Sequence, residues 1–285
     1  MIPAAFDYAA PTTVDEALQA LAGAGDREVK VLGGGQSLIP VLRLRMATPG
    51  LVVDLSRIGE LKGITEDGDA IVIGAMTTHS EVQKSAVVQQ HAALLSLAAG
   101  TVADEQIRHR GTLGGSLVHA DPAGDLAAPV LALGAELVIA GPGGRRTVSA
   151  ADFFVDLFTT AVGAGELLVA IRIPKHTGWG ARYEKFNRTA QAWSIVAVAA
   201  TVRAEGGTIT AARVALTNMG LVPIRATAVE QALVGQPATA ESISAAAARA
   251  ADGTAPMADS NADEDYRRHL AKVLTGRAVT AAAGV

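Results

Sequence analysis

Apolar and polar positions follow one another along the chain at spacings that predict alternating helices and strands. Thr13-x-x-Glu16 has the form of a capping box, and the apolar residues after it recur at helical spacing up to a glycine, which predicts a first helix. The apolar runs 28–32 and 51–55 predict buried strands with a glycine loop and a short helix between them. Residues 1–57 are therefore expected to form a small βαβ-type unit.

The middle of the chain repeats this alternation. Residues 69–75 predict a strand, Thr78-x-x-Glu81 is a second capping-box pattern, and helical spacing continues through 91–100. We expect a second unit over 58–176. Three further strands of this unit, separated by Gly and Pro turns, are predicted at 135–140, 145–150 and 166–174.

The segment KHTGWG (175–180) has the composition of a linker, and a third pattern begins after it. A strand is predicted at 183–186, and two long strands within 193–219 predict a hairpin that turns at Gly206-Gly207, because paired glycines permit positive φ. We expect residues 177–285 to form a C-terminal α+β domain with an antiparallel sheet. Its helices are predicted near 223–234, 240–252 and 263–281, and the last places Tyr266, Leu270, Val273 and Leu274 on one face.

Composition narrows the class of protein. Hydrophobic residues make up 49% of the 285 positions, but no apolar run reaches the roughly 18 residues that a membrane span needs. The start MIPAAFDYAAPT lacks the basic and apolar segments of a signal peptide. We therefore expect a soluble, cytoplasmic protein.

Residue counts exclude several kinds of chemistry on this chain. It has no cysteine, so disulfides, thiolate nucleophiles and iron–sulfur clusters would have to lie on another chain. The six histidines do not show metal-site spacing. A net charge of −4 without a basic block gives no reason to expect nucleic acid as a partner. We expect no metal ligand and no cysteine-based chemistry on this chain.

The stretch LGGGQS (32–37) is a candidate anion site between a strand and a helix. It matches neither the Rossmann nor the Walker pattern. Three glycines nevertheless allow successive N–H groups to converge on one anion, and Ser37 is placed to cap the next helix or to donate its hydroxyl. A tight strand-to-helix turn is an equally good interpretation of this loop alone.

A second glycine loop, Thr112-Leu113-Gly114-Gly115-Ser116, favours the ligand interpretation. Two turns at which main chain can pass close to a ligand suggest one long, diphosphate-bearing cofactor. Asp121 and Asp125 follow in DPAGD, where they could accept hydrogen bonds from sugar hydroxyls or could simply stabilise the loop.

The order LGGGQS, IRHRGTLGGSLVHADPAGD, ELLVAIRIP and YEKFNR resembles the FAD-binding medium subunits of the molybdenum hydroxylases, above all those of the aerobic carbon monoxide dehydrogenase type. The resemblance covers essentially the whole chain. It implies an α+β fold, in which a two-part FAD-binding domain of the PCMH type precedes the C-terminal domain. The family often has A-G-G-H-S in the first loop, so Gln36 stands in place of a His that can become cationic.

The resemblance also implies a set of residues that bind FAD without a covalent link. The two loops would hold the diphosphate and the next part of the cofactor, Val102 and Ile107 would line the pocket, and Asp125 would lie at the ribityl or adenosine side. Leu168 matches the adenine region. The implied set is Val31, Leu32, Gly33, Gly34, Gly35, Gln36, Ser37, Leu38, Val102, Ile107, Gly111, Thr112, Gly114, Gly115, Ser116, Val118, Asp125, Leu168, Lys185 and Trp193.

Some of these positions keep a second interpretation. Lys185 matches a lysine near the flavin ring, but it could be a solvated strand residue. Trp193 could face the flavin or could be a buried strand residue. Arg108 and Arg110, on either side of His109, could be surface charges or could dock a partner.

In the family that the chain resembles, a large subunit with a molybdenum cofactor oxidises the substrate, and two [2Fe-2S] clusters on a small subunit pass electrons to FAD. The resemblance implies an electron-transfer flavoprotein subunit in a dimer of heterotrimers, with a quinone or another external acceptor. The complex as a whole could associate with the inner face of the membrane. The same subunit could instead serve a xanthine, nicotine or aldehyde enzyme. A self-contained flavin oxidase fits less well because the chain has no cysteine and a small C-terminal domain, and a non-enzymatic module gives no reason for two ordered glycine loops. The resemblance leaves the redox chemistry to the cofactor and so implies no catalytic side chain on this chain.

Overall fold

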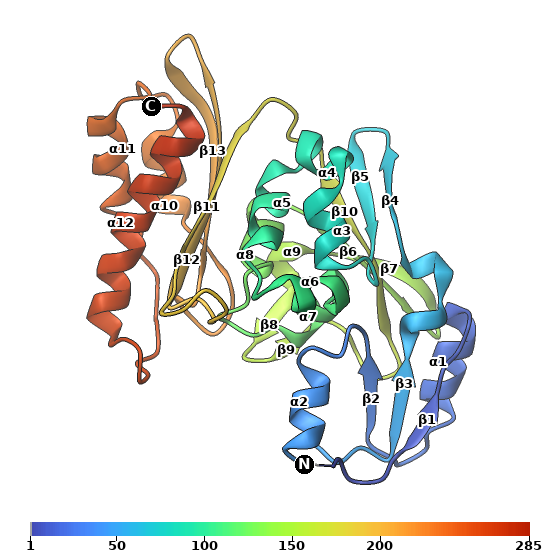
Figure 1. Cartoon of the computed structure of the whole chain (residues 1–285). Helices are drawn as coiled ribbons and strands as arrows, with labels where there is room; N and C mark the ends of the chain where they lie inside the picture. Colours follow the sequence, from blue (N-terminus) through green and yellow to red (C-terminus); the bar gives the residue numbers. More distant parts are fainter. Residues whose placement is uncertain (1) are drawn as a thin grey trace.

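The computed structural model describes residues 2–285, which form three consecutive sheets with helices packed on them (Figure 1). The first sheet has three parallel strands in the order β1-β3-β2. Two helices and two short 3₁₀ segments accompany it. The elements are β1 Asp7–Ala9, α1 Val14–Ala22, β2 Val29–Leu32, α2 Leu38–Arg43, β3 Leu51–Asp54, η1 Leu55–Arg57 and η2 Gly59–Leu61.

The second sheet is antiparallel, in the order β4-β5-β10-β6-β7. Helices cover one of its faces, and the N-terminal sheet lies against part of the other (Figure 1). Its strands are β4 Ile64–Asp67, β5 Ala70–Gly74, β6 Glu136–Gly141, β7 Gly144–Ser149 and β10 Leu167–Pro174, with a small hairpin of β8 Phe154–Asp156 and β9 Thr159–Thr160. Its helices are α3 His79–Lys84, α4 Ala86–His91, α5 Ala93–Gly100, α6 Glu105–Arg110, α7 Leu113–His119, α8 Ala127–Ala132 and α9 Ala150–Phe153.

The third sheet is antiparallel in the order β11-β12-β13-β14. The last three helices cover its outer face, and α5 and α8 of the middle region lie against its inner face (Figure 1). The elements are β11 Gly180–Phe186, β12 Val196–Glu205, β13 Thr208–Thr217, β14 Ile224–Arg225, α10 Thr227–Leu233, α11 Ala240–Ala247 and α12 Glu264–Ala283.

Three hydrophobic cores hold these layers together. The largest lies between the five-stranded sheet and its helices and reaches Ala197 and Ala199 on the inner face of the third sheet. A second core, around Val198, lies between the outer face of that sheet and the last helices. The third joins Val53 of β3 to Val169 of β10. Because β12 is covered on both faces, its first seven residues are all buried, which explains an apolar run without alternation.

The predicted pattern of strands and helices is largely confirmed, as is the hairpin turn, in which Gly206 and Gly207 have φ of +56° and +79°. The first capping box is half wrong. Thr13 does accept from the N–H of Glu16 (3.2 Å), but the Glu16 carboxylate accepts from Thr12 instead of closing the box. The second box, at Thr78 and Glu81, is complete.

Two other expectations for the helices need correction. The helical stretch after Thr78 is broken, because Ser85 adopts an extended conformation (ψ 121°) and caps the next helix instead of continuing the first. In the last helix, Leu270 and Leu274 pack inward as expected, but Tyr266 is 43% exposed and Arg267 occupies the core-facing position. The short strands β1, β4, β8, β9 and β14 were not predicted, nor were helices α6, α7, α8 and α9. The second glycine loop was expected to be a turn, but residues 113–119 form α7, so Gly114 and Gly115 lie in the first turn of a helix that Thr112 caps.

Within residues 2–285, no helix combines the length and the apolar character needed to cross a bilayer.

Candidate cofactor-binding site

The two glycine loops meet in space although they are far apart in the chain. A β-carbon on Gly34 would overlap the main-chain carbonyl of Arg110, and one on Gly33 would lie 3.1 Å from the Thr112 hydroxyl and 3.8 Å from the Gly115 α-carbon. Glycine is therefore required at Gly34 by the close approach of two main chains. The loops form one continuous surface.

The first loop leaves its main-chain donors unpaired. Gly35 takes a positive φ of +79°, and the Gln36 side chain donates back to the Gly34 carbonyl at 3.0 Å. Within the part of the chain that the structure describes, the N–H groups of residues 34–38 donate no hydrogen bond to another protein atom. These donors lie at the start of α2, where an anion such as a diphosphate would satisfy them.

Ser37 does not have the capping role considered from the sequence. It occupies the N-cap position of α2, but its own backbone is helical (φ −103°, ψ −47°) and its hydroxyl makes no capping hydrogen bond. Ser37 is partly exposed, so its hydroxyl can donate to a ligand, which was also expected from the sequence.

The second loop is bonded internally, which corrects the expectation that both loops offer free main chain. The N–H of Leu113 donates to the Thr77 carbonyl (2.9 Å) and that of Gly114 to the Ala75 carbonyl (2.8 Å). The N–H of Gly115 donates to the Thr112 hydroxyl (3.1 Å), which caps α7. This loop can therefore offer a ligand its outer surface, but not these donors.

The outward-facing part of α7 is formed by Gly115 and Val118, which are exposed, and by half-buried Ser116. A β-carbon on Gly114 would instead lie 2.6 Å from the Ala75 side chain, so this glycine serves packing. Gly114 thus packs against the protein interior, whereas the adjacent Gly115 lies at the surface.

His79 supports the second loop, a role that the sequence did not suggest. The main-chain N–H of His79 donates to the Gly111 carbonyl (2.9 Å), and a β-carbon on Gly111 would lie 2.7 Å from the His79 ring. Burial, and then the nearby charge of Arg108, lower the pKa of His79 to about 4, so the ring is neutral near neutral pH. No local pattern could reveal this burial, because a loop much later in the chain produces it.

Asp125 is the centre of a buried polar cluster that joins the middle region to the third sheet. Its Oδ1 accepts from the hydroxyls of Tyr183 (2.9 Å) and Ser194 (2.8 Å), and its Oδ2 accepts from Lys185 Nζ (2.7 Å). Burial raises the pKa of Asp125, while the Lys185 charge and these hydrogen bonds oppose the rise. Lys185 is not a solvated strand residue: its side chain is 6% exposed.

The segment between β11 and β12 carries Trp193 on the surface, at 55% exposure, so its interpretation as a buried strand residue is wrong. Both flanks of Trp193 are tied to the middle region. Gln191 donates to Asp104 (2.8 Å), and Ser194 donates to Asp125. The segment that carries Trp193 is therefore held near the turn 101–104, which contains Val102.

The other candidate residues differ in their contacts and in their exposure. Asp121 stabilises its own loop by accepting from the N–H of Ala123 (2.9 Å), as one interpretation held. Leu168 is 5% exposed and packs in the main core, so its side chain is not open to a ligand. Arg110 is exposed, whereas the Arg108 side chain is 11% exposed and not a surface charge.

The predicted residues therefore differ in accessibility. Those at least partly exposed are Val31, Leu32, Gly33, Gly34, Gln36, Ser37, Leu38, Val102, Ile107, Gly115, Ser116, Val118 and Trp193. The buried ones are Gly35, Gly111, Thr112, Gly114, Asp125 and Leu168, together with the side chain of Lys185.

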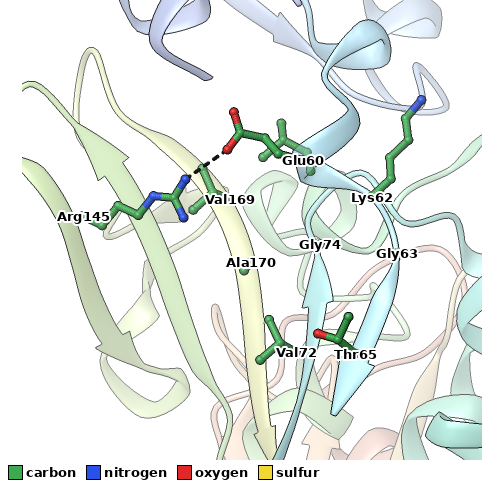
Figure 2. Close-up of a pocket in the computed structure, with 10 residues that line it drawn as sticks. Glu60, Lys62, Gly63, Thr65, Val72, Gly74, Arg145, Val169 and Ala170 are labelled. Atoms are coloured by element: carbon green, nitrogen blue, oxygen red, sulfur yellow. Dashed lines mark hydrogen bonds and ion pairs between the residues drawn. The ribbon is translucent and has the colours of Figure 1, made fainter. Parts of the chain in front are cut away.

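A separate pocket of about 230 Å³ lies between η2 and the sheet face formed by β4, β5 and β10 (Figure 2). Figure 2 shows Glu60 and Arg145 pointing toward each other, and they form an ion pair at 3.2 Å. None of the predicted site residues lines this pocket. Among residues 2–285, no cluster of three or more acidic or histidine side chains suits a metal ion.

Comparison with known proteins places this geometry in a family. Residues 4–176 match the model of the FAD binding domain in molybdopterin dehydrogenase, and residues 181–282 match that of the CO dehydrogenase flavoprotein C-terminal domain. The carbon monoxide dehydrogenase medium chain of Hydrogenophaga pseudoflava is 40% identical over 99% of this chain and 98% of its own length. That of Afipia carboxidovorans is 38% identical over 98% of this chain and 97% of its own.

A solved structure gives the same result. The structure of carbon monoxide dehydrogenase from Hydrogenophaga pseudoflava that lacks the Mo-pyranopterin moiety of the cofactor contains a chain 41% identical to this one. It superposes with a TM-score of 0.96 and covers 100% of this chain and 99% of that one. The chain therefore belongs to the FAD-binding medium subunits of the molybdenum hydroxylases and is similar over its whole length to those of carbon monoxide dehydrogenase.

Proposed function

We propose that this chain is the FAD-carrying electron-transfer subunit of an aerobic carbon monoxide dehydrogenase. It accepts electrons from an iron–sulfur subunit and passes them to an external acceptor such as a quinone. The observation that carries the proposal is the row of unpaired N–H groups at residues 34–38, found in a chain that matches such subunits from end to end.

The residues of the chain bind and orient the cofactor. The N–H groups of 34–38 and the Ser37 hydroxyl would hold the diphosphate, and Gly115, Ser116 and Val118 would line the next part of the site. Val102 and Trp193 would complete the pocket on the flavin side. FAD, when bound, supplies the redox chemistry, because it can exchange electrons singly or in pairs.

The buried cluster around Asp125 positions this site and does not take part in chemistry. Lys185 donates to Asp125 and also to the carbonyl of Thr101 at 3.1 Å, so it ties the third sheet to the turn that carries Val102. The remaining residues of the expected set fall into two groups. The partly or fully exposed ones line the site, namely Val31, Leu32, Gly33, Leu38 and Ile107, and the buried ones support it from within, namely Gly111, Thr112, Gly114 and Leu168.

The organisation that we propose is a two-part FAD-binding domain at 1–57 and 58–176, followed by a C-terminal domain at 177–285. Its partners are a small subunit with [2Fe-2S] clusters and a large subunit with the molybdenum cofactor, in a dimer of heterotrimers. The complex is cytoplasmic and associates with the inner face of the membrane through its other parts. The absence of cysteine from this chain supports placing the clusters on a partner.

A second candidate is the FAD subunit of another molybdenum hydroxylase, acting on xanthine, nicotine or an aldehyde. The site described here would serve any of these, since the substrate is oxidised on the large subunit. A large partner whose active-site loop carries a cysteine suited to a copper–molybdenum centre favours carbon monoxide.

The test is purification of the native complex from its source, with a visible spectrum and identification of the co-purifying chains. The proposal predicts a flavin band, FAD released on denaturation, and reduction of the flavin when carbon monoxide is added. A complex that lacks FAD contradicts the proposed function. One that carries FAD but is reduced only by a heterocycle or an aldehyde supports the second candidate.

A further inference from the structure

Arg108 lies against the turn 101–104 of the proposed flavin site. It belongs to α6, on which its neighbours His109 and Arg110 are exposed, but its own side chain is 11% exposed. Its Nη1 donates to the carbonyl of Val102 at 2.7 Å and to that of Ala103 at 3.4 Å. The guanidinium thus binds the main chain of the turn 101–104 directly.

This turn has a backbone conformation that needs external support. Ala103 has a φ of +40°, a region that residues with a β-carbon rarely adopt. The third sheet holds the two ends of the turn, because Lys185 donates to the Thr101 carbonyl (3.1 Å) and Gln191 to the Asp104 carboxylate (2.8 Å). The middle of the turn, at Val102 and Ala103, is held by Arg108.

Arg108 also lies close to the support of the second glycine loop. Its charge contributes, after burial, to the low pKa of His79, whose ring packs against Gly111. The guanidinium is fixed on its other side by Glu105, which accepts from Nη2 at 3.2 Å. The largely buried guanidinium thus binds the Val102 turn directly and acts through its charge on the histidine that packs against Gly111.

We propose that Arg108 is a positioning residue for FAD: it holds the turn 101–104, in which Ala103 has a positive φ, so that Val102 forms one wall of the flavin site. This inference rests on the proposed function, because it takes FAD as the ligand. It concerns binding and orientation only, and the residue does not touch the reacting atoms.

The experiment compares variants of the full chain by FAD titration, with flavin fluorescence and visible absorption as readouts and thermal unfolding measured alongside. In Arg108→Gln we expect FAD to bind about tenfold more weakly or worse, because a charged donor to a buried carbonyl is lost. We also expect a shifted flavin absorption band. Arg108→Lys retains a charged donor and should recover much of the affinity.

A second variant separates positioning from simple loss of stability. Glycine accepts positive φ without strain, so Arg108→Gln combined with Ala103→Gly should bind FAD more tightly than Arg108→Gln alone. Ile243→Val, a truncation in the C-terminal core, controls for lower stability, and Arg203→Gln controls for loss of an exposed arginine. Both controls should bind FAD like the wild type.

The outcomes are distinct. If the wild type binds no FAD, the proposed function fails and the inference fails with it. If the wild type binds FAD and Arg108→Gln binds it with the same affinity and spectrum, only the inference is overturned. The inference is also overturned if Ile243→Val, at an equal loss of thermal stability, weakens FAD binding as much as Arg108→Gln does. It is overturned as well if adding Ala103→Gly to Arg108→Gln restores no FAD affinity.

Discussion

The two glycine loops look alike in sequence but differ in their hydrogen bonding. In the first, the N–H groups of residues 34–38 have no protein acceptor within the described chain, and the Ser37 hydroxyl caps nothing. In the second, the N–H groups of residues 113–115 all donate to protein oxygens. The first loop has main-chain donors available for a ligand, whereas the donors of the second are already paired.

This difference shows that paired glycines alone do not identify a phosphate site. Glycine at Gly34 and Gly114 is required by close packing against Arg110 and Ala75, which is a structural requirement in both loops. What distinguishes the first loop is its unsatisfied donors, because main-chain donors without an acceptor are costly when they are removed from water.

The largest expected effect is at Asp125, beyond the second loop. In Asp125→Ala the buried Lys185 loses its counter-ion, and Tyr183 and Ser194 lose their acceptor. We expect the free energy of unfolding to fall by about 3–5 kcal/mol, measured by urea denaturation. Asp121→Ala, which removes a loop hydrogen bond and a 4.0 Å contact with the partly exposed His119, should cost about 1 kcal/mol or less. Equal losses in the two variants would contradict the cluster described here.

The pH dependence of stability tests the support of the second loop. The pKa of His79 is lowered from 6.5 to about 4 in the folded chain, so at intermediate pH the unfolded chain binds the additional proton. The stabilising contribution of burying neutral His79 is fully present above the pKa of this residue in the unfolded chain, and it is lost as the pH falls toward 4. Between about pH 7 and pH 5 the wild type should lose about 2 kcal/mol more than His79→Gln does. Parallel curves in denaturation experiments would show that His79 is not buried in its neutral form.

Gly114→Ala tests the packing of the second loop. The new methyl group would lie 2.6 Å from both the side chain and the carbonyl oxygen of Ala75, so main chain has to move. We expect a loss of about 1–3 kcal/mol in the free energy of unfolding. Gly59→Ala is the control, because a β-carbon there meets no atom within 4 Å. A Gly114→Ala variant as stable as this control would contradict the packing role.

Ser37→Ala should have the smallest effect on stability and a clear effect on the ligand. Since its hydroxyl caps nothing, the free energy of unfolding without FAD should change by less than about 0.5 kcal/mol. FAD affinity should fall about tenfold, because a hydrogen bond to a charged phosphate is lost. Ser37→Thr retains the hydroxyl and serves as the matched control in the FAD titration. A stability loss without an affinity loss would reverse the assignment of the first loop.

Local patterns were sufficient to predict the strands and helices of most of the fold. The hairpin at Gly206-Gly207 and the capping box at Thr78 depend on neighbouring residues, and both were predicted correctly. The break at Ser85 was missed, because the side chain that caps the second helix also ends the first. Strand β1 was missed because three residues carry too little pattern to be recognised.

The candidate site was predictable as two loops but not as a bonded structure. The pairing of Asp125 with Lys185 joins residues 60 positions apart, and no spacing rule links them. The burial of Arg108 and the exposure of Trp193 likewise depend on how the third sheet packs against the middle region. Residue types along the chain identified candidates, and tertiary contacts decided their functions.

Amide hydrogen exchange on the full chain, with and without FAD, tests most directly whether the unpaired N–H groups of residues 34–38 bind the cofactor. We expect these amides to exchange rapidly without FAD and to become strongly protected when it binds, whereas residues 113–115 should be protected in both states. First-loop amides that are protected without FAD, or that gain no protection when it binds, would show that these groups do not bind it.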